Sequence, residues 1–554
     1  MQRLWKFLLF FLLSSLIITP VQAAPRPPVD IQLLDISDWH AQLDPVAVNN
    51  VNIAGAAVLS AYFQADRAAN PNTLTFTAGD AFGASPPLSG FFNEEPGVRA
   101  MRLMGIDADT LGNHNFDRNL AHLQSMITLA GQPTDANFPG KPFSFVSANL
   151  SNLAGNLTGV APYKIFTVGG VKIAVIGITN PEAPTLVFPG NFGTIQITDP
   201  IPAANKARAS AKQEGAQLFV ALTHLGITGI NPATGAASGP LIDFANNVGN
   251  FDVIYGDHTD VPYSGIHNNA LVIENLSRGV SYSRTKLSVD PENGRVINRS
   301  NEFVTPVAGN VTPDPAIIAM LAPYRIQLAA AFDAQIAVAT ALFPRGGNPS
   351  VERSGEAAIG NLVADALRLR YGTQLALTNG GGLRQPLPSS YVPFNTALRR
   401  RAAPYQVGPP FDLVIGDIFA VLPFGNSVVT RNVTGAQLWA ALENGVSQIN
   451  TATGVGADGR FPQISGFRFT FKYSNAPGAR VTSVTLADGT PILADGTVYT
   501  LATNNFVNAG GDFYSMLADG QGATREIMAD VVLAYVRGLA TITPVIDGRI
   551  TKQP

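Results

Sequence analysis

The chain has 554 residues, a formal net charge of −3 and 14% charged residues. This length exceeds one ordinary hydrophobic core, so two domains are expected, and the near-neutral charge provides no basic surface for a nucleic-acid polymer. A hydrophobic content of 46%, with 53 glycines and 40 prolines, indicates a folded, loop-rich protein. The absence of cysteine excludes disulfides, thiol catalysis and zinc–thiolate sites.

The N-terminus has the three parts of a secretory signal peptide. A basic head at residues 1–6 precedes an apolar run at residues 7–18, and small residues precede a cleavage point after Ala23. An uncleaved membrane anchor is the alternative, but the apolar run is shorter than a bilayer span. We therefore expect an exported protein in the periplasm, at the cell surface or outside the cell, with no transmembrane segment after cleavage.

The first half alternates strand-like apolar runs with helical patterns. Polar side chains directly follow five of these runs, at residues 31–36, 74–77, 106–111, 218–222 and 251–255. Open α/β sheets bind their ligands at the carboxyl ends of the strands, so these side chains are expected to meet. A further run at residues 171–178 is almost unbroken and β-branched, which indicates a strand covered on both faces.

Four of the six histidines lie in these polar clusters: His40, His114, His224 and His258. A lone histidine is usually a structural residue, but joint placement after strand-like runs favours a site. Two divalent cations require a bridging carboxylate with neutral nitrogens and hard oxygens. The expected bridge is Asp80, which follows a glycine at a strand end.

The remaining metal ligands are expected from four other clusters. Asp38 and His40 stand two residues apart at one strand end, so their side chains point to the same side and can share one metal. The second metal position can be completed by Asn113, His224 and His258.

Residues 112–117 bring an amide, an imidazole and a carboxylate together at a strand end. His114 can carry a proton at neutral pH, and Asp117 can hold its imidazole in one tautomer. The alternative is a polar turn that caps the helix expected at residues 118–130. The segment therefore indicates catalysis only if the other ligands complete a site.

Taken in order, these motifs resemble those of calcineurin-like metallophosphoesterases. The matching segments are Asp38-Trp39-His40, Gly79-Asp80, Gly112-Asn113-His114, Thr223-His224 and Gly256-Asp257-His258-Thr259-Asp260. More narrowly, the chain resembles the secreted 5′-nucleotidase family, which includes cyclic nucleotide phosphodiesterases and UDP-sugar hydrolases. The resemblance spans nearly all of the mature chain, and several motifs in fixed order are a specific signal where each alone is weak.

The resemblance implies an α/β fold, α+β overall, with two domains. After a signal peptide at residues 1–23, a four-layer αββα metallophosphoesterase domain is expected at residues 24–305. A linker with a helix is expected at residues 306–345, and an α/β substrate-binding domain of the 5′-nucleotidase type at residues 346–554. The apolar stretch at 314–333 is predicted as the linker helix, broken or restarted at a proline; a helix of the first core is the alternative.

The resemblance also assigns roles to the polar residues. It implies two divalent metal ions, manganese, zinc, magnesium or calcium, of which the first binds Asp38, His40, Asp80 and Asp260. The second metal binds Asp80, Asn113, His224 and His258. By the same resemblance His114 is catalytic rather than a ligand: it faces the scissile phosphate and stabilises or protonates the leaving oxygen, and Asp117 holds it in place.

The last loop departs from the family, which usually has Gly-Gly-His followed by Ser or Thr and then His or Gln. This chain has Asp257 and Asp260 in that loop. As a ligand, Asp260 would add a negative charge and favour the harder ions manganese, magnesium and calcium over zinc. The added charge is also expected to raise the pKa of bound water and to shift activity toward higher pH. The simpler explanation of Asp257 is a turn residue in place of glycine.

The second half carries patterns consistent with the implied α/β domain. Helices are expected at residues 355–369 and after Thr434, where Gln437 can complete a capping box. A long loop is expected at residues 388–410. Strands are expected at residues 374–377, 467–473, 481–486 and 498–503.

Phe424 and Phe506 each lie beside glycines and polar side chains in a loop of the second half. Two such rings can sandwich a flat base, since stacking accepts any base; packing in the core is the alternative. In the 5′-nucleotidase family the matching phenylalanines stack on the nucleobase, and the matching aspartate, Asp512, binds ribose hydroxyls. The other expected substrate contacts are Arg353, Asn379, Arg384 and Asn426.

The sequence therefore predicts an exported, dinuclear-metal phosphomonoesterase that hydrolyses nucleoside 5′-monophosphates to nucleoside and phosphate. The alternatives within the enzymes are a 2′,3′-cyclic nucleotide phosphodiesterase, a UDP-sugar hydrolase and a thiosulfate-processing relative that would not need the phenylalanine pair. The alternative from a different class is a nucleoside-binding surface protein with an inactive metal site. The expected partner is a small nucleotide, and the oligomeric state stays open.

Overall fold

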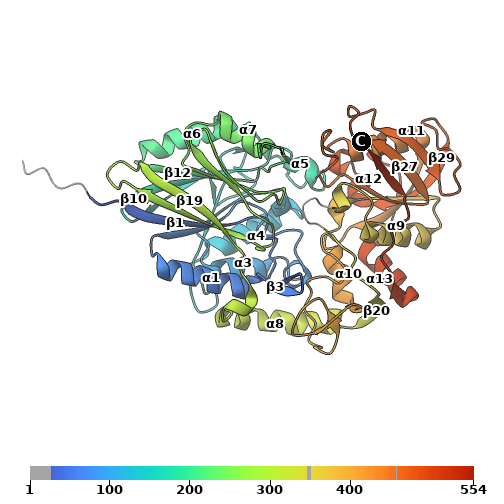
Figure 1. The fold of residues 1–554 in the computed structure, drawn as a ribbon, viewed down its shortest axis with the longest axis horizontal. Helices are drawn as coiled ribbons and strands as arrows, with labels where there is room; N and C mark the ends of the chain where they lie inside the picture. The colour runs from blue at the N-terminus through green and yellow to red at the C-terminus, as the bar shows by residue number, and fades with distance from the viewer. Residues whose placement is uncertain (1–25, 232, 346–350, 457) are drawn as a thin grey trace, which may run out of the picture.

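The computed structural model describes residues 26–231, 233–345, 351–456 and 458–554, so the expected signal peptide lies outside the described residues. Figure 1 shows two parts of the chain side by side. The first part, blue to green, is built around long strands, and the second, orange to red, holds the C-terminus. Helix α8 (Pro315–Phe332) runs along the lower side of the first part toward the second part in this view.

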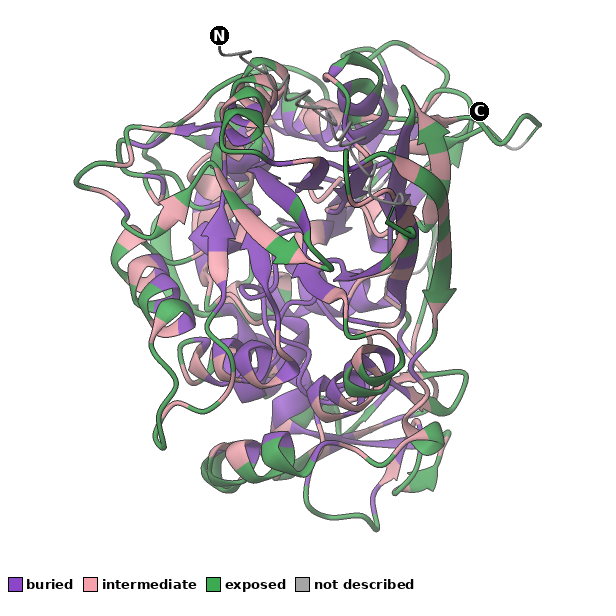
Figure 2. Ribbon diagram, turned by 90° about the vertical axis from the view of Figure 1, so that its left-hand side faces the viewer, coloured by how far each residue is buried: buried purple, intermediate pink, exposed green. Residues whose placement is uncertain are grey.

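Two β-sheets form the centre of the first domain. One has the strand order β19-β18-β1-β4-β5-β6-β8 and the other β16-β17-β15-β12-β10-β9. Apolar side chains from both sheets, such as Phe76 and Val175, form one buried core between them. Figure 2 shows buried strands at the centre and exposed loops outside them. The strands are β1 (Val29–Ile36), β4 (Thr73–Thr77), β5 (Ala108–Thr110), β6 (Ser144–Val146), β8 (Val160–Ala161), β9 (Tyr163–Val168), β10 (Val171–Ile178), β12 (Leu218–Thr223), β15 (Val253–Gly256), β16 (Tyr263–His267), β17 (Ala270–Glu274), β18 (Tyr282–Val289) and β19 (Val296–Val304).

Helices cover the outer face of each sheet. In Figure 1 one group lies on the lower side and the other on the upper side. The seven-stranded sheet is covered by α1 (Ala56–Ala69), α3 (Glu95–Met104) and α4 (Leu120–Gly131). The six-stranded sheet is covered by α6 (Pro200–Gln213) and α7 (Pro240–Asn247). The first domain thus has the four layers αββα, as predicted.

The strands that lead to the candidate site are parallel and buried. β1 pairs with β4, β4 with β5, and β12 with both β10 and β15, all in parallel. β10 is apolar along most of its length and buried at all but one position, as expected for a strand covered on both faces. Because parallel strands end together, the loops after β1, β4, β5, β12 and β15 meet at one edge.

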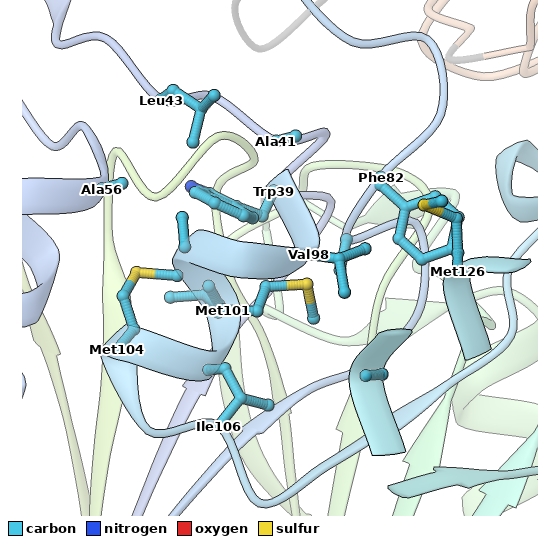
Figure 3. Close-up of a cluster of buried hydrophobic side chains, with 14 of the residues drawn as sticks. Trp39, Ala41, Leu43, Ala56, Phe82, Val98, Met101, Met104, Ile106 and Met126 are labelled. Carbon is cyan, nitrogen blue, oxygen red and sulfur yellow. The ribbon is translucent and has the colours of Figure 1, made fainter. Parts of the chain in front are cut away.

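A second core of the first domain lies beneath these loops. Trp39 is wholly buried there, in one cluster with Leu43, Val98 and Met101 (Figure 3). Truncating such a buried aromatic side chain to alanine typically costs about 3–5 kcal/mol. Since this tryptophan stands between Asp38 and His40, its burial holds the turn that presents both polar side chains.

The second domain is a mixed sheet covered on both faces. Its five-stranded sheet has the order β26-β21-β29-β25-β30. α9 (Ala358–Tyr371) and α13 (Met528–Leu539) pack on one face, and α11 (Gly435–Val446) packs on the other with the sheet β28-β27-β32. Thr434 and Gln437 form the predicted capping box of α11. The strands are β21 (Leu375–Asn379), β25 (Ser427–Thr434), β26 (Pro462–Ser465), β27 (Phe467–Lys472), β28 (Val481–Leu486), β29 (Val498–Asn504), β30 (Ala523–Ile527) and β32 (Ile550–Gln553).

The connection between the domains contains the expected helix and one element of the second domain. Helix α8 is continuous through Pro323, so the proline does not break it. The strand after it, β20 (Gln335–Ala339), pairs with β24 (Phe411–Val414) and β31 (Thr541–Ile542). The sheets of the second domain therefore begin before residue 346, because β20 completes a sheet whose other strands come later in the chain.

The segment predicted as a long loop, residues 388–410, docks the second domain onto the first. Tyr391 and Leu398 are buried in the same core as Trp39. The Tyr391 hydroxyl donates to Asp333 at the end of α8 (2.6 Å). Docking against a distant part of the chain explains how parts of so irregular a segment are buried.

Helix α8 bears on the expectation that no membrane span follows the signal peptide. Among the described residues it is the single helix long and apolar enough to cross a membrane by length and composition. It is tied to the first domain, since Tyr324 donates to Glu95 (3.0 Å) and Arg325 forms an ion pair with Asp44. These contacts favour a helix that packs on the folded domain.

Candidate active site

The predicted metal ligands come from five loops at the strand ends of both sheets. They follow β1, β4, β5, β12 and β15, and the structure brings them together: Asp38, His40, Asp80, Asn113, His224, His258 and Asp260. Most of their side chains are buried, and His258 and Asp260 are half-buried. The site therefore depends on the sandwich that aligns the strands.

One group of donor atoms converges on Nε2 of His224. Asp80 Oδ2 lies 3.1 Å from this nitrogen, Asn113 Oδ1 lies 3.1 Å from it, and His258 Nδ1 lies 3.2 Å from it. Two nitrogens, an amide oxygen and a carboxylate oxygen suit a borderline or hard divalent cation. These are the residues predicted for the second metal position.

A neighbouring group is formed by Asp38, His40 and Asp80, whose ligand atoms lie within 4.8 Å of one another. Asp38 Oδ1 lies 3.6 Å from His40 Nε2. Asp260 lines the same small cavity. Asp80 belongs to both groups, as a bridging carboxylate must.

The bridging carboxylate fits divalent metals because one of its oxygens is poorly satisfied. Asp80 Oδ2 is buried and makes no hydrogen bond of good geometry among the described residues, although His224 Nε2 lies 3.1 Å from it. A buried, unpaired carboxylate oxygen is costly unless a cation neutralises it. Among the described residues this clustering of carboxylates and imidazoles is therefore best explained as a metal centre.

The backbone of the site is held in uncommon conformations. Asp38, His40, Asp80, His258 and Asp260 all have positive φ, between 40° and 86°. Such left-handed residues cost about 1–3 kcal/mol each and are kept where the surrounding structure demands them. The packing around the loops therefore supports the geometry of the donor atoms.

Glycine is required where the loops cross. A Cβ on Gly112 would lie 2.2 Å from Asp80 Oδ1, and a Cβ on Gly79, which has φ of +103°, would lie 2.7 Å from His224 Nδ1. No side chain fits at either position. The two glycines of the motifs thus allow the bridging carboxylate and the imidazole to approach each other.

The buried imidazoles have unlike environments. Burial, together with Arg384, lowers the pKa of His40 well below its ordinary value, and burial with His224 does the same for His258. Burial also lowers the pKa of His224, but Asp80 and Asp257 more than offset it and leave the pKa raised. Neutral imidazoles such as His40 and His258 are the form that binds a metal.

His114 faces the cavity from a short 3-10 helix, η1 (His114–Phe116). Its backbone N–H donates to Asp80 Oδ1 (2.8 Å), and its Nδ1 lies 2.9 Å from Asp117 Oδ1. The following helix α4 begins at Leu120, capped by Asn119, two residues later than the predicted start. Asp117 is therefore placed by the turn rather than by the helix, and it orients the imidazole of His114.

Asp109, on β5, supports the loop of the bridging carboxylate from below. Its Oδ1 accepts from the Thr77 hydroxyl (2.7 Å) and from the Gly79 N–H (3.0 Å). Burial raises the pKa of Asp109 to about 8, although the two hydrogen bonds lower it. The folded protein thus holds a proton that an unfolded chain releases near pH 4.

Asp109 is expected to make stability fall as the pH rises. Between about pH 4 and pH 8 the folded state binds the extra proton, so the free energy of unfolding decreases with pH in that window. The variant Asp109→Asn lacks this proton linkage. In metal-free protein, the free energy of unfolding of the variant minus that of the wild type should therefore rise by about 2 kcal/mol or more from pH 5 to pH 8. Urea denaturation at both pH values measures this; parallel pH profiles would contradict it.

A cavity of about 570 Å³ lies between the two domains and reaches the metal ligands. Its first-domain wall includes Asn113, His114, Asp117 and His258. Its second-domain wall contains all the predicted substrate-binding residues: Arg353, Asn379, Arg384, Phe424, Asn426, Phe506 and Asp512. The structure thus places every predicted catalytic and substrate residue around one space.

The two phenylalanines are held by different means. The Phe424 ring, after α10 (Ile415–Val421), stacks on the His114 ring at 5.7 Å. The Phe506 ring, on α12 (Asn505–Asn508), lies against Gly511, where a Cβ would meet it at 2.2 Å. Both rings line the cavity, so they are available to a flat ligand.

Asp512 stands in a buried polar network beside these rings. Its Oδ2 accepts from Asn379 Nδ2 (2.7 Å), and Asn379 Oδ1 accepts from Asn504 (3.0 Å). Burial, reinforced by Asp458, raises the pKa of Asp512 to about 7. Oxygens fixed in this way suit the hydroxyls of a sugar.

The structure adds two candidate site residues that the sequence did not indicate. The small cavity at the metal ligands is lined by Arg278 and Arg345 as well as by the predicted Arg353 and Arg384. Arg384 Nη2 donates to His40 Nε2 (2.9 Å), and burial with Arg345 lowers the pKa of Arg384 to about 9. A cluster of arginines of this kind favours the binding of an anion such as phosphate. Arg278 and Arg345 lie outside the motifs, so no spacing signal pointed to them.

Arg278 also joins the two domains at the site. Its backbone N–H donates to the carbonyl of Asp38 (2.9 Å), and its guanidinium donates to the carbonyl of Arg384. The metal-binding turn is thereby tied to the arginine loop of the second domain.

Comparison with known proteins agrees with this site. A family model for the 5′-nucleotidase C-terminal domain matches residues 335–519. The 5′-nucleotidase precursor of Thermus thermophilus has a TM-score of 0.78 and 26% identity, covering 95% of this chain and 99% of that one. The 5′-nucleotidase of Diplobatis ommata is 24% identical, covering 94% of this chain and 90% of that protein. The chain belongs to the 5′-nucleotidase family.

As a member of the 5′-nucleotidase family, the chain has the two-domain α/β architecture of its relatives. The family also contains proteins with other names. Endonuclease YhcR of Bacillus subtilis is 27% identical over 88% of this chain, and the chain spans 38% of its length. Family membership by itself therefore does not identify a substrate.

Proposed function

We propose that the chain is an exported phosphomonoesterase that binds two divalent metal ions and hydrolyses nucleoside 5′-monophosphates to nucleoside and phosphate. The first domain is the catalytic domain, and the second, which starts with β20, binds the nucleoside. The predicted signal peptide supports export. The metal ligands are the seven acidic, amide and imidazole side chains described above.

One observation carries the proposal: a single interdomain cavity joins the metal ligands to two phenylalanines and a buried aspartate. The metal ligands and the arginines suit a phosphate, the rings of Phe424 and Phe506 suit a base, and Asp512 suits ribose hydroxyls. The inactive-site alternative has little support, because every expected ligand is present.

The residues of the chain divide the chemistry among them. Divalent metals, when bound, supply positive charge to the phosphoryl group and lower the pKa of water. Arg353 and Arg384 bind the phosphate oxygens and orient the phosphorus for in-line attack by water. As the bond from phosphorus to the ribose 5′-oxygen breaks, His114 donates a proton to that oxygen. Asp117 holds the imidazole of His114 in the orientation for this proton transfer, because its carboxylate accepts a hydrogen bond from Nδ1 of His114.

Phosphate release from AMP tests the proposal. Metal-stripped full-length protein is refilled with manganese, magnesium, calcium or zinc, and bis(p-nitrophenyl) phosphate and 2′,3′-cyclic AMP are measured alongside. We expect metal-dependent turnover of AMP above both diesters, with the harder ions more effective than zinc because Asp260 is a carboxylate. Preference for the diesters would move the assignment to a phosphodiesterase, and no turnover with any metal would favour a binding protein.

Replacing His114 should slow the reaction in a way that depends on the leaving group. His114→Ala is expected to lower kcat for AMP by about 10²–10⁴-fold, because a general acid is lost. With p-nitrophenyl phosphate, whose leaving group needs no proton, the loss should be much smaller. Metal content should be unchanged, since His114 is not a ligand. Equal losses with both substrates would contradict the general-acid role.

A further inference from the structure

Asp257 is the residue that the family resemblance left unexplained. The family usually has glycine at this position, and a turn residue would be expected at the surface. Instead the Asp257 side chain is wholly buried, with 0% of its surface exposed. A buried carboxylate needs a partner, so its role is sought among its contacts.

The two oxygens of Asp257 have different surroundings. Oδ1 accepts from the backbone N–H of His258 (2.9 Å), which also donates to Asp38 Oδ2 (2.7 Å). Oδ2 has no hydrogen-bond partner among the described residues, and it lies 3.6 Å from Nδ1 of His224. Asp38, His224 and Asp257 place their ligand atoms within 4.8 Å of one another.

The imidazole of His224 has two sides. Nε2 points to the second metal position, where Asp80, Asn113 and His258 converge. Nδ1 points the other way, toward the carbonyl oxygen of Ala78 (3.3 Å) and Asp257 Oδ2. An imidazole that binds a metal through Nε2 must carry its proton on Nδ1, and an acceptor there fixes the tautomer and the ring orientation.

We propose that Asp257 is a positioning residue whose carboxylate holds the Nδ1–H of His224, so that Nε2 is presented to the second metal. This inference rests on the proposed metal site and deepens it. The carbonyl of Ala78 is a neutral acceptor that does not depend on the residue at position 257, whereas the carboxylate of Asp257 adds a charged acceptor. Asp257 also anchors the N–H of His258, a second ligand of the same metal.

The variant Asp257→Asn separates the two roles. The asparagine Oδ1 can still accept from the His258 N–H, but its NH₂ group cannot accept from His224 Nδ1. Asp257→Gly removes both contacts and is the residue of the family. Asp252→Asn is the matched control: Asp252 is a partly buried carboxylate that accepts from Phe219 N–H (2.9 Å) at the opposite end of β15.

Metal binding to the metal-stripped full chain is measured by Zn²⁺ and Mn²⁺ titration, and the histidine tautomers of the Zn²⁺-loaded protein by ¹⁵N NMR. We expect Asp257→Asn and Asp257→Gly to weaken binding of the second metal about 10–100-fold. Both variants should also reduce the ¹⁵N NMR signal of the His224 tautomer that carries its proton on Nδ1. The first metal and the Asp252→Asn control should be little changed.

The outcomes keep the inference and the proposed function apart. A wild type that binds no metal would overturn the proposed function. A wild type that binds two metals, with both Asp257 variants binding equally well, would overturn only the inference. If the variants bind both metals equally more weakly and the His224 tautomer is unchanged, the positioning role is also overturned. Asp257 would then contribute only its negative charge.

Discussion

Asp80→Asn is expected to abolish binding of both metals and to lower turnover of AMP by about 10³-fold or more. Asp80 contributes to both groups of donor atoms, with Oδ2 placed 3.1 Å from His224 Nε2. An amide keeps the shape of the side chain but has no second anionic oxygen to bridge two cations. Metal content after gel filtration and phosphate release from AMP measure the two effects.

The control for Asp80 is a buried aspartate away from the donor atoms. Asp107 lies just before β5, at the end of that strand opposite the site, where it accepts from the Thr75 N–H (3.0 Å) and pairs with Lys141. Asp107→Asn should reduce stability without removing metal. An Asp80→Asn protein that keeps two metals and wild-type turnover would overturn the bridging role.

Removing both aromatic rings should reduce the use of nucleotides selectively. Stacking of a base on an aromatic side chain contributes about 1–3 kcal/mol, so Phe424→Ala with Phe506→Ala should lower kcat/KM for AMP roughly 10–100-fold or more. The loss should fall mainly on KM, because the rings contact the base and not the reacting phosphate. Steady-state kinetics of the single and double variants check this.

Ribose 5-phosphate is the matched substrate for the phenylalanine variants, because it keeps the phosphate and the sugar but has no base. Its hydrolysis should be nearly unchanged in the double variant. Equal losses with AMP and with ribose 5-phosphate would show that the rings only support the cavity. No loss with either substrate would point to a relative that does not use the rings, such as the thiosulfate-processing branch.

The metal motifs were predictable because each is local. Asp38 and His40 share one turn, and Gly79 and Gly112 directly precede residues that need close approach. Their spacing and order in the chain carried the signal, and the structure brings them to one edge of two sheets. The hydrophobic periodicity likewise predicted strands such as β10 and the capped helix α11.

Residues that act through long-range contacts were not predictable. Arg278 and Arg345 enter the site from segments without a motif, and Tyr391 reaches the first-domain core from a loop. The buried state of Asp257 was also hidden, because a turn sequence gives no measure of exposure. Each of these depends on which surfaces of the two domains meet.

By itself the sequence determined the strand and helix pattern, the metal-binding residue types and the family resemblance, because these depend on neighbours within a few positions. Only the tertiary structure decided that Asp80 stands between two donor groups and that Asp257 lies behind His224. It also decided that Phe424, Phe506 and Asp512 share one cavity with His114. Such distances arise from the packing of segments tens to hundreds of residues apart, which local chemistry does not specify.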